Sequence, residues 1–139
     1  MDRRLAFLTA FLGFTAVALG AFGAHAVKGA LEGLPDAAQR LAWWETGSRY
    51  HLLHTFAVGL IAVLSAHVTS RFPNYAAGLF TLGITLFSGS LYVMTLTGTR
   101  ALGIVTPFGG VAFLAGWLAL AFAARGLGRQ KEAPRPGEP

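Results

Sequence analysis

Long stretches without a charged residue are the feature that most constrains this chain. Residues 5–24, 72–99 and 101–124 contain no Asp, Glu, Lys or Arg. A helix needs roughly 20 residues to cross about 30 Å of hydrocarbon. A segment in lipid must satisfy its own backbone hydrogen bonds, and these runs do not alternate as barrel strands do. The sequence therefore predicts an all-α membrane protein.

Four membrane spans are expected, and they form one compact bundle. The first, third and fourth are long enough by themselves, whereas the second has a short apolar run that borrows residues from the preceding segment. The predicted spans cover residues 5–26, 50–68, 75–96 and 102–124. Residues 1–124 form one domain, and the polar, proline-containing residues 125–139 are expected to be a disordered basic tail.

Composition supports the membrane assignment and excludes other classes. Hydrophobic residues make up 54% of the 139 residues and charged residues only 12%, about half the usual share of a soluble domain. The net charge of +5 arises from basic residues at the ends of apolar runs, where they act as topology markers. No basic stripe is left for nucleic acid, and the absence of cysteine excludes thiolate chemistry.

The one substantial polar segment lies between the first two spans. It contains two acid-before-base pairs at i,i+4, Asp36–Arg40 and Glu45–Arg49, which support a helix. We expect an amphipathic helix near the membrane interface, anchored by Trp43 and Trp44, which then turns or runs on into span two. Gly47 is a plausible bend.

Two boundaries have alternative interpretations. Residues 24–26 fit a signal-peptidase pattern, but the long apolar stretch and the three following spans favour retention of the first span. At the fourth span, Pro107 fits the first helical position with Thr106 as N-cap. The alternative there is a helix that starts at Ala101 and is kinked at Pro107.

Basic residues predict the orientation. Four spans place both ends of the chain and the Arg71 loop on one side. Seven basic residues lie on that side and four on the other, namely Lys28, Arg40, Arg49 and Arg100. The positive-inside rule then places both termini in the cytoplasm.

Small residues inside the spans favour close helix packing, because little else drives helix association in lipid. They occur in each of the three long runs, as Ala16, Gly20 and Ala24, as Gly78, Gly83 and Gly89, and as Ala112 and Gly116. A tight bundle explains them, and one ladder serving as a homo-oligomer seam is the alternative.

Polar side chains concentrate in the outer half of the predicted bundle, and such groups at membrane depth are often functional. The candidate cluster contains His25, Glu45, Arg49, Tyr50, His54, Ser88, Ser90, Tyr92 and Thr106. We expect His25 and His54 to approach each other beneath the interfacial helix, either locking the bundle or holding a ligand. His51 is expected to face the headgroups. No metal or cofactor is expected.

Several motifs together resemble a known family. They are residues 20–26 (GAFGAHA), Tyr50 with His54, residues 86–92 (LFSGSLY), residues 96–98, residues 102–110 (LGIVTPFGG) and Gly116-Trp117. This combination resembles the YgdD/YwdK family of small bacterial membrane proteins, catalogued as domain of unknown function 423, and is similar to mitochondrial transmembrane protein 256. The resemblance implies a four-span inner-membrane protein with a retained first span, and it implies no catalytic residues. Residues 44–47 depart from the family's usual Thr-Ala pair.

Three functional hypotheses follow. The first is a non-enzymatic structural or accessory protein of a larger membrane complex, supported by small size and glycine-rich helices. The second is a small transporter or channel acting as an oligomer. The third is a lipid- or quinone-binding protein that uses the outer polar cluster. The expected partners are the lipid bilayer and either another membrane protein or further copies of this chain.

Overall fold

The computed structural model describes residues 2–67 and 70–125, and every regular element within them is helical. The elements are α1 (Arg3–Phe22), a π-helical turn (Gly23–Val27), α2 (Lys28–Leu31), α3 (Ala37–Leu64), α4 (Phe72–Gly83), a second π-helical turn (Ile84–Ser88), α5 (Gly89–Thr97), a 3-10 turn (Arg100–Ile104) and α6 (Thr106–Ala124). The predicted all-α class is confirmed. Of the predicted tail, residues 125–139, all but Arg125 lie outside the described residues.

Three continuous helices are long and apolar enough to cross a membrane. They are Arg3–Leu31, Phe72–Thr97 and Arg100–Ala124. The fourth long helix, α3, has 28 residues and is about 42 Å long at 1.5 Å per residue. Its first half carries Arg40, Glu45 and Arg49, so α3 does not share the apolar character of the other three.

The helix expected after Pro35 is present. It begins at Ala37 and runs on without a break to Leu64 as α3, while Lys28–Leu31 ends the first helix. Its placement at the membrane interface stays a prediction. Gly47 does not bend α3. It is buried within the helix, where a Cβ atom would lie 3.4 Å from the Ser88 carbonyl oxygen. One face of segment 37–50 therefore packs against α5, because the absence of a side chain at Gly47 allows the two helices to approach closely.

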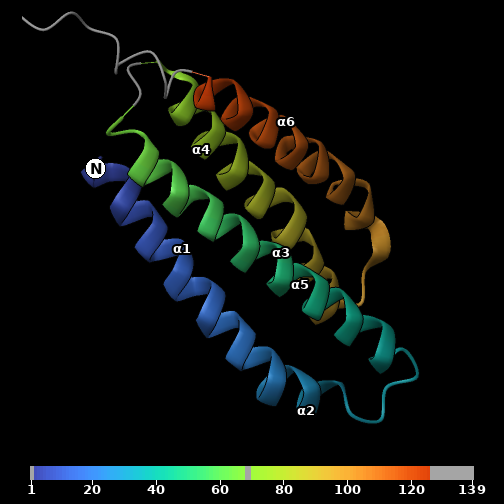
Figure 1. Cartoon of the computed structure of the whole chain (residues 1–139). Helices are drawn as coiled ribbons and strands as arrows, with labels where there is room; N and C mark the ends of the chain where they lie inside the picture. Colours follow the sequence, from blue (N-terminus) through green and yellow to red (C-terminus); the bar gives the residue numbers. More distant parts are fainter. Residues whose placement is uncertain (1, 68–69, 126–139) are drawn as a thin grey trace, which may run out of the picture.

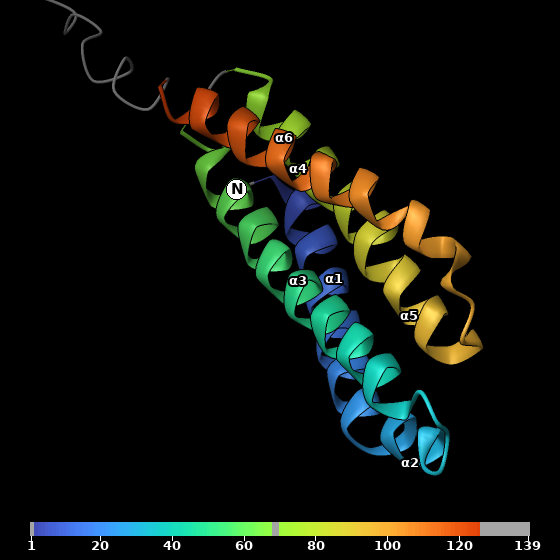
Figure 2. The same cartoon turned by 90° about the vertical axis from the view of Figure 1, so that its right-hand side faces the viewer.

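The helices pack side by side with neighbours antiparallel (Figures 1 and 2). α1 packs along α3, α3 packs along α4 and α5, and α4 packs along α6. The start of α1 and the end of α6 lie at the same end of the molecule, and α2 lies at the opposite end (Figure 1). Because both ends of the helical chain lie at one end of the molecule, the fold contains an even number of long helical passes from one end to the other.

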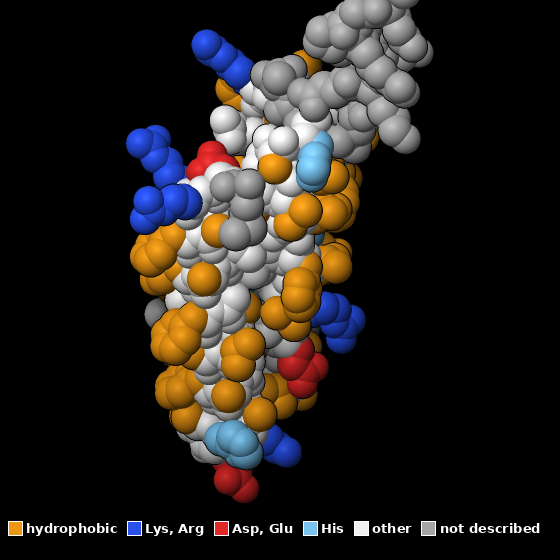
Figure 3. Space-filling model, turned by 60° about the vertical axis from the view of Figure 1, so that its left-hand side comes forward, with side chains coloured by type: hydrophobic (Ala, Val, Ile, Leu, Met, Phe, Trp, Pro, Cys, Tyr) orange, Lys and Arg blue, Asp and Glu red, His pale blue; other side chains and the backbone are white. Residues whose placement is uncertain are grey.

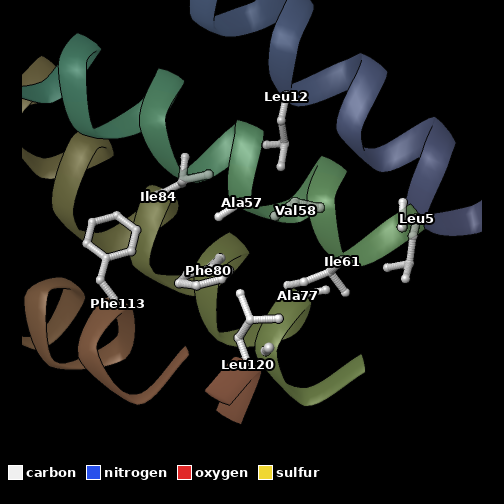
Figure 4. Close-up of a cluster of buried hydrophobic side chains, with 12 residues drawn as sticks. Leu5, Leu12, Ala57, Val58, Ile61, Ala77, Phe80, Ile84, Phe113 and Leu120 are labelled. Atoms are coloured by element: carbon white, nitrogen blue, oxygen red, sulfur yellow. The ribbon is translucent and has the colours of Figure 1, made fainter. Parts of the chain in front are cut away.

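An apolar core joins all four long helices. Leu12 of α1, Val58 of α3, Phe80 of α4 and Phe113 of α6 belong to one buried cluster (Figure 4). Leu5 and Leu120 extend this cluster toward the end of the molecule that holds the two termini. In lipid such contacts stabilise the fold by close packing rather than by withdrawal from water.

Small residues make several of these contacts possible. Ala112 and Gly116 are buried as expected, and a Cβ atom at Gly116 would lie 2.7 Å from the Phe80 ring. The ladder on α1 behaves differently. Ala16 is buried, whereas a Cβ atom at Gly20 would have no neighbour within 4 Å and Ala24 is exposed.

The start of α6 has features of both alternatives stated for residues 101–107, a helix that starts at Pro107 and a helical segment that begins near Ala101. Pro107 lies in the first turn of the helix, as predicted, and a 3-10 turn fills the apolar connector before it. Thr106 is the first helical residue and provides no side-chain cap. Its hydroxyl lies instead 2.8 Å from the hydroxyl of Ser90, so the N-cap prediction is wrong.

Candidate functional site

His54 occupies an aromatic setting between α3 and α6. Its Nδ1–H donates to the carbonyl oxygen of Tyr50 at 2.8 Å, and the Trp117 indole N–H donates to Nε2 at 3.3 Å. The residue is 3% exposed, and its imidazole stacks on Phe113, with centroids 3.6 Å apart. Both ring nitrogens are therefore engaged, and the tautomer carries its proton on Nδ1.

A groove of about 490 Å³ lies beside this histidine. Its walls are mostly aromatic and aliphatic, with Tyr50 and Phe87 at one side and Trp117 at the other. Tyr50 is 38% exposed and contacts the Phe87 ring at a centroid distance of 4.6 Å. The shape and lining suit an apolar chain or ring.

A second polar group lies between α1, α3 and α5. His51 is 4% exposed, with Nε2 3.4 Å from the Thr15 hydroxyl and Nδ1 3.4 Å from the Tyr92 hydroxyl. Thr15 donates its own proton to the Leu12 carbonyl oxygen at 3.0 Å. His51 Nε2–H is therefore the donor to Thr15, while Nδ1 contacts the Tyr92 hydroxyl, which donates to the Ser48 hydroxyl oxygen. The expectation that His51 faces the headgroups is wrong.

The serines of the candidate cluster have separate roles. Ser90 donates to the Phe87 carbonyl oxygen at 2.9 Å and contacts Thr106, which joins α5 to the start of α6. Ser88 is fully buried in the π-helical turn, and its hydroxyl has no hydrogen-bond partner among the described residues. Tyr92 also lies 3.4 Å from the Ser48 hydroxyl.

The predicted approach of His25 to His54 is wrong. His25 is exposed and lines a pocket with Lys28 and Glu32 at the α2 end of the molecule. His54 lies level with Gly13, since the adjacent Thr55 contacts Gly13 across the antiparallel helices. Eleven or twelve residues then separate the two histidines along the axis, about 17 Å at 1.5 Å per residue. The error arose because α3 begins at Ala37 and not near Tyr50.

Trp44 is not an interface anchor. It is 3% exposed, and its indole N–H donates to the Leu19 carbonyl oxygen at 3.0 Å. The ring contacts Tyr92 at a centroid distance of 4.6 Å and covers Gly23. Trp44 therefore links α1, α3 and α5, while Trp43 is half-buried.

Glu45 and Arg49 are exposed, and they form no ion pair with each other. Among the described residues the one ion pair is Asp36–Arg40, at 2.9 Å. Glu45 and Arg49 follow the outward face of α3. An acidic and a basic side chain interrupt the apolar surface part-way along one edge of the molecule in Figure 3.

The depth of Arg49 follows from the register of α3 against its neighbours. Thr55 contacts Gly13 and Gly59 contacts Thr9, so Arg49 lies level with residues close to 19 in α1. Measured along the helix axis, this level is about 13 Å from Lys28 and farther from Arg4.

The contact of α3 with α5 gives a second estimate. There the Thr95 hydroxyl donates to the Arg40 carbonyl oxygen at 3.0 Å. Arg49 then lies level with residues near 86, about 20 Å from either Arg71 or Arg100. Arg49 therefore lies well inside the apolar section of the molecule.

Comparisons with known proteins decide the family. A family model described as "Protein of unknown function (DUF423)" matches residues 19–110. The chain belongs to the DUF423 family. The UPF0382 membrane protein of Haemophilus influenzae is 40% identical over 124 residues, which cover 89% of this chain and 95% of that protein.

Two further relatives support the same family assignment. UPF0382 membrane protein YwdK of Bacillus subtilis is 42% identical over 110 residues, covering 78% of this chain and 85% of the relative. UPF0382 inner membrane protein YgdD of Escherichia coli K12 is 38% identical over 129 residues, covering 93% and 95%. No solved structure matches the chain. The resemblance stated from the motifs is confirmed, and the protein is an integral membrane protein of this family.

Sequence reasoning missed several members of this DUF423 site. Thr15 and Phe113 were absent from the candidate cluster, although each contacts a buried histidine. His51 was expected to face the headgroups, and its spacing to His54 was considered only as a metal-ligand spacing. Its i,i+3 spacing to His54 was the available signal, since both lie on the buried side of one helix.

No metal centre accompanies these groups. Across residues 2–67 and 70–125, no three His, Asp or Glu side chains lie close enough together to hold a metal ion. The chemistry that this part of the chain offers is hydrogen bonding, aromatic contact and exposed side chains of opposite charge, Glu45 and Arg49 among them.

Proposed function

We propose that this protein crosses the inner membrane four times, with both termini in the cytoplasm, and acts as a non-enzymatic accessory protein through lateral helix contacts. α3 is the second span in this arrangement. The shared end of the two described termini supports it (Figure 1). Arg3, Arg4, Arg71 and Arg125 lie at that end, which the positive-inside rule places in the cytoplasm.

The exposure of Arg49 carries the accessory role. In this proposed arrangement Arg49 lies within the hydrocarbon layer, where insertion of an arginine at the centre of a helix costs about 2.5–3.5 kcal/mol. Charged residues at that depth usually face a protein interior or a water-filled cavity. In this chain Arg49 lies on the outer face of α3, so contact with another protein would shield it from lipid.

The lateral contact is tested by the mass of the protein purified in mild detergent or in nanodiscs. We expect native mass spectrometry to find a complex heavier than one chain, and Arg49→Leu to reduce its abundance. Lys28→Leu is the matched control, because Lys28 is an exposed basic residue at the α2 end. A wild-type protein that is monomeric under both conditions would overturn the accessory role.

The orientation is tested separately with reporter fusions. A cytoplasm-active fluorescent reporter should be active after Pro139, and an export-dependent phosphatase should be active when inserted at Gly33. Gly33 is exposed between α2 and α3. The opposite pattern would reverse the proposed topology.

A second candidate function is binding of an apolar membrane molecule in the groove beside His54. The aromatic lining and the volume of about 490 Å³ favour it. Titration with a short-chain quinone should quench tryptophan fluorescence saturably, because Trp117 lines the groove. Trp43→Phe should preserve this quenching and Trp117→Phe should reduce it. Equal, non-saturating quenching in both variants would contradict a site.

A further inference from the structure

The exposed face of α3 has the residue spacing of a helix-pairing surface. Positions 38, 42, 45, 49, 52 and 56 are separated alternately by four and three residues, which is the spacing of the contact seam in paired helices. All six are exposed, and they are Ala38, Ala42, Glu45, Arg49, Leu52 and Phe56. Arg49 thus lies within this seam.

We propose that the occupant of this seam is α3 of a second copy of the chain, paired crosswise through Glu45 and Arg49. This inference rests on the proposed lateral contact and names its partner. Two copies with the same membrane topology have parallel α3 helices related by a two-fold axis along the membrane normal. A two-fold interface uses the same surface on both copies, so that surface must complement itself.

The charges of the seam are self-complementary. Glu45 and Arg49 lie one helical turn apart on one face, and neither is paired within the described part of the chain. In a parallel two-fold pair each position lies level with the same position of the other copy, so Glu45 reaches Arg49 of the partner subunit diagonally, one helical turn along the seam, and the reciprocal contact forms across the axis. The four charges then balance, and each has an opposite charge beside it in place of lipid.

The shape of α3 favours close approach at the same place. Ala38 and Ala42 are exposed beside the charges, and small residues let two helix backbones come near enough to pack. The outward face of α1 is bulkier, with Phe7, Phe11 and Phe14 exposed by 76%, 56% and 72%. On α3, small residues therefore lie on the same face as the unpaired charges, which favours contact with another helix. The bulky apolar surface of α1 favours contact with lipid acyl chains.

Cross-linking in lipid vesicles gives a direct test, because the chain contains no cysteine. Ala42→Cys should form a disulfide-linked dimer on mild oxidation, since position 42 meets its own copy across a two-fold seam. Phe14→Cys on α1 is the matched control and should remain mostly monomeric. A dimer that cross-links at position 14 and not at position 42 would overturn the proposal.

Charge reversal identifies the partner. Glu45→Arg and Arg49→Glu should each lower the dimer association constant roughly tenfold, a change of about 1.4 kcal/mol, measured from the dimer fraction over a series of protein-to-lipid ratios. When the two variants are co-expressed with different tags, they should pair with each other and restore the dimer. The mixed pair also controls for folding, because a misfolded variant would not be rescued by its complement.

The outcomes separate this inference from the proposed function. A complex that depends on Arg49 but contains one copy of this chain would sink the two-fold pair and retain the accessory role. Self-association that charge reversal leaves unchanged would also overturn the crosswise pairing. A chain that is monomeric in vesicles and in detergent would remove both proposals.

Discussion

His54 and Phe113 lie face to face across α3 and α6, with ring centroids 3.6 Å apart and ring planes inclined by 9°. This stack fills the space that Gly83 leaves open on the neighbouring helix, where a Cβ atom would overlap the Phe113 ring. The contact joins three helices at one point and explains why a titratable side chain is buried in an apolar region.

Replacement of His54 should destabilise the fold. His54→Ala removes the stack and leaves the Trp117 indole N–H without its acceptor, so we expect a loss of about 3 kcal/mol, near the value for truncation of a buried aromatic residue. Thermal unfolding in detergent measures it. His25→Ala should add its own small cost independently, because the two residues are far apart. Strong coupling between them would contradict the structure.

Two adjacent glycines in α6 provide a matched pair. A Cβ atom at Gly109 would overlap the Phe87 backbone nitrogen, whereas Gly110 has nothing within 4 Å. Gly109→Ala should therefore push α6 away from the π-helical turn and cost about 1–3 kcal/mol. Gly110→Ala should be neutral or slightly stabilising, since Ala favours helix. Equal melting temperatures for the two variants would refute this packing.

A similar pair tests the contact between α1 and Trp44. Gly23→Ala would place a methyl group against the Trp44 indole nitrogen and break its hydrogen bond to Leu19. We expect a loss of about 1–3 kcal/mol and a red shift in tryptophan emission as the ring moves. Gly20→Ala, one turn earlier with no nearby atoms, is the control. The prediction fails if Gly20→Ala has the larger effect.

The His51 group should behave as one unit. Tyr92→Phe and Thr15→Val each remove one of the hydroxyls that contact the imidazole, and each should cost about 1–2 kcal/mol because a buried polar atom loses its partner. The double variant should cost less than the sum. Thr85→Val is the control, because that exposed hydroxyl only bonds to the Thr81 carbonyl oxygen. Full additivity would show that the group is not coupled.

The first span should remain in the mature protein. Leu5, Leu12 and Ala16 of α1 are buried against the rest of the fold, so cleavage after Ala26 would remove part of the core. Intact-mass measurement of the purified protein is decisive. A product that begins at Val27 would contradict both the retained span and the structure.

The four helical regions followed largely from the sequence. The long uncharged runs placed the first, third and fourth helices close to their observed positions, because an apolar run of that length has few other stable arrangements. The sequence divided α3, which begins at Ala37, between an interfacial helix and a second span from residue 50. Arg40, Glu45 and Arg49 favoured that division, and residue type alone does not say which neighbours a segment contacts.

The candidate site shows the same division. Residue type and position identified His54, Ser90, Tyr92 and Thr106 as polar groups within helices. Their partners depended on which helix faces lie opposite each other at each level. Trp117 and Thr15 therefore entered the site only once the register of the packed helices was known.

By itself, the sequence determined that this chain is helical and belongs in a membrane, because backbone groups in lipid must be satisfied within a helix and charge is excluded from long runs. Its motifs also identified the family. Tertiary structure decided that α3 runs unbroken from Ala37 to Leu64, that His25 and His54 lie apart, and that Arg49 lies on the exposed face of α3, level with the apolar sections of its neighbours. Those properties depend on register between helices, which is set by close contacts at positions such as Gly47 and Gly109 between residues far apart in the chain.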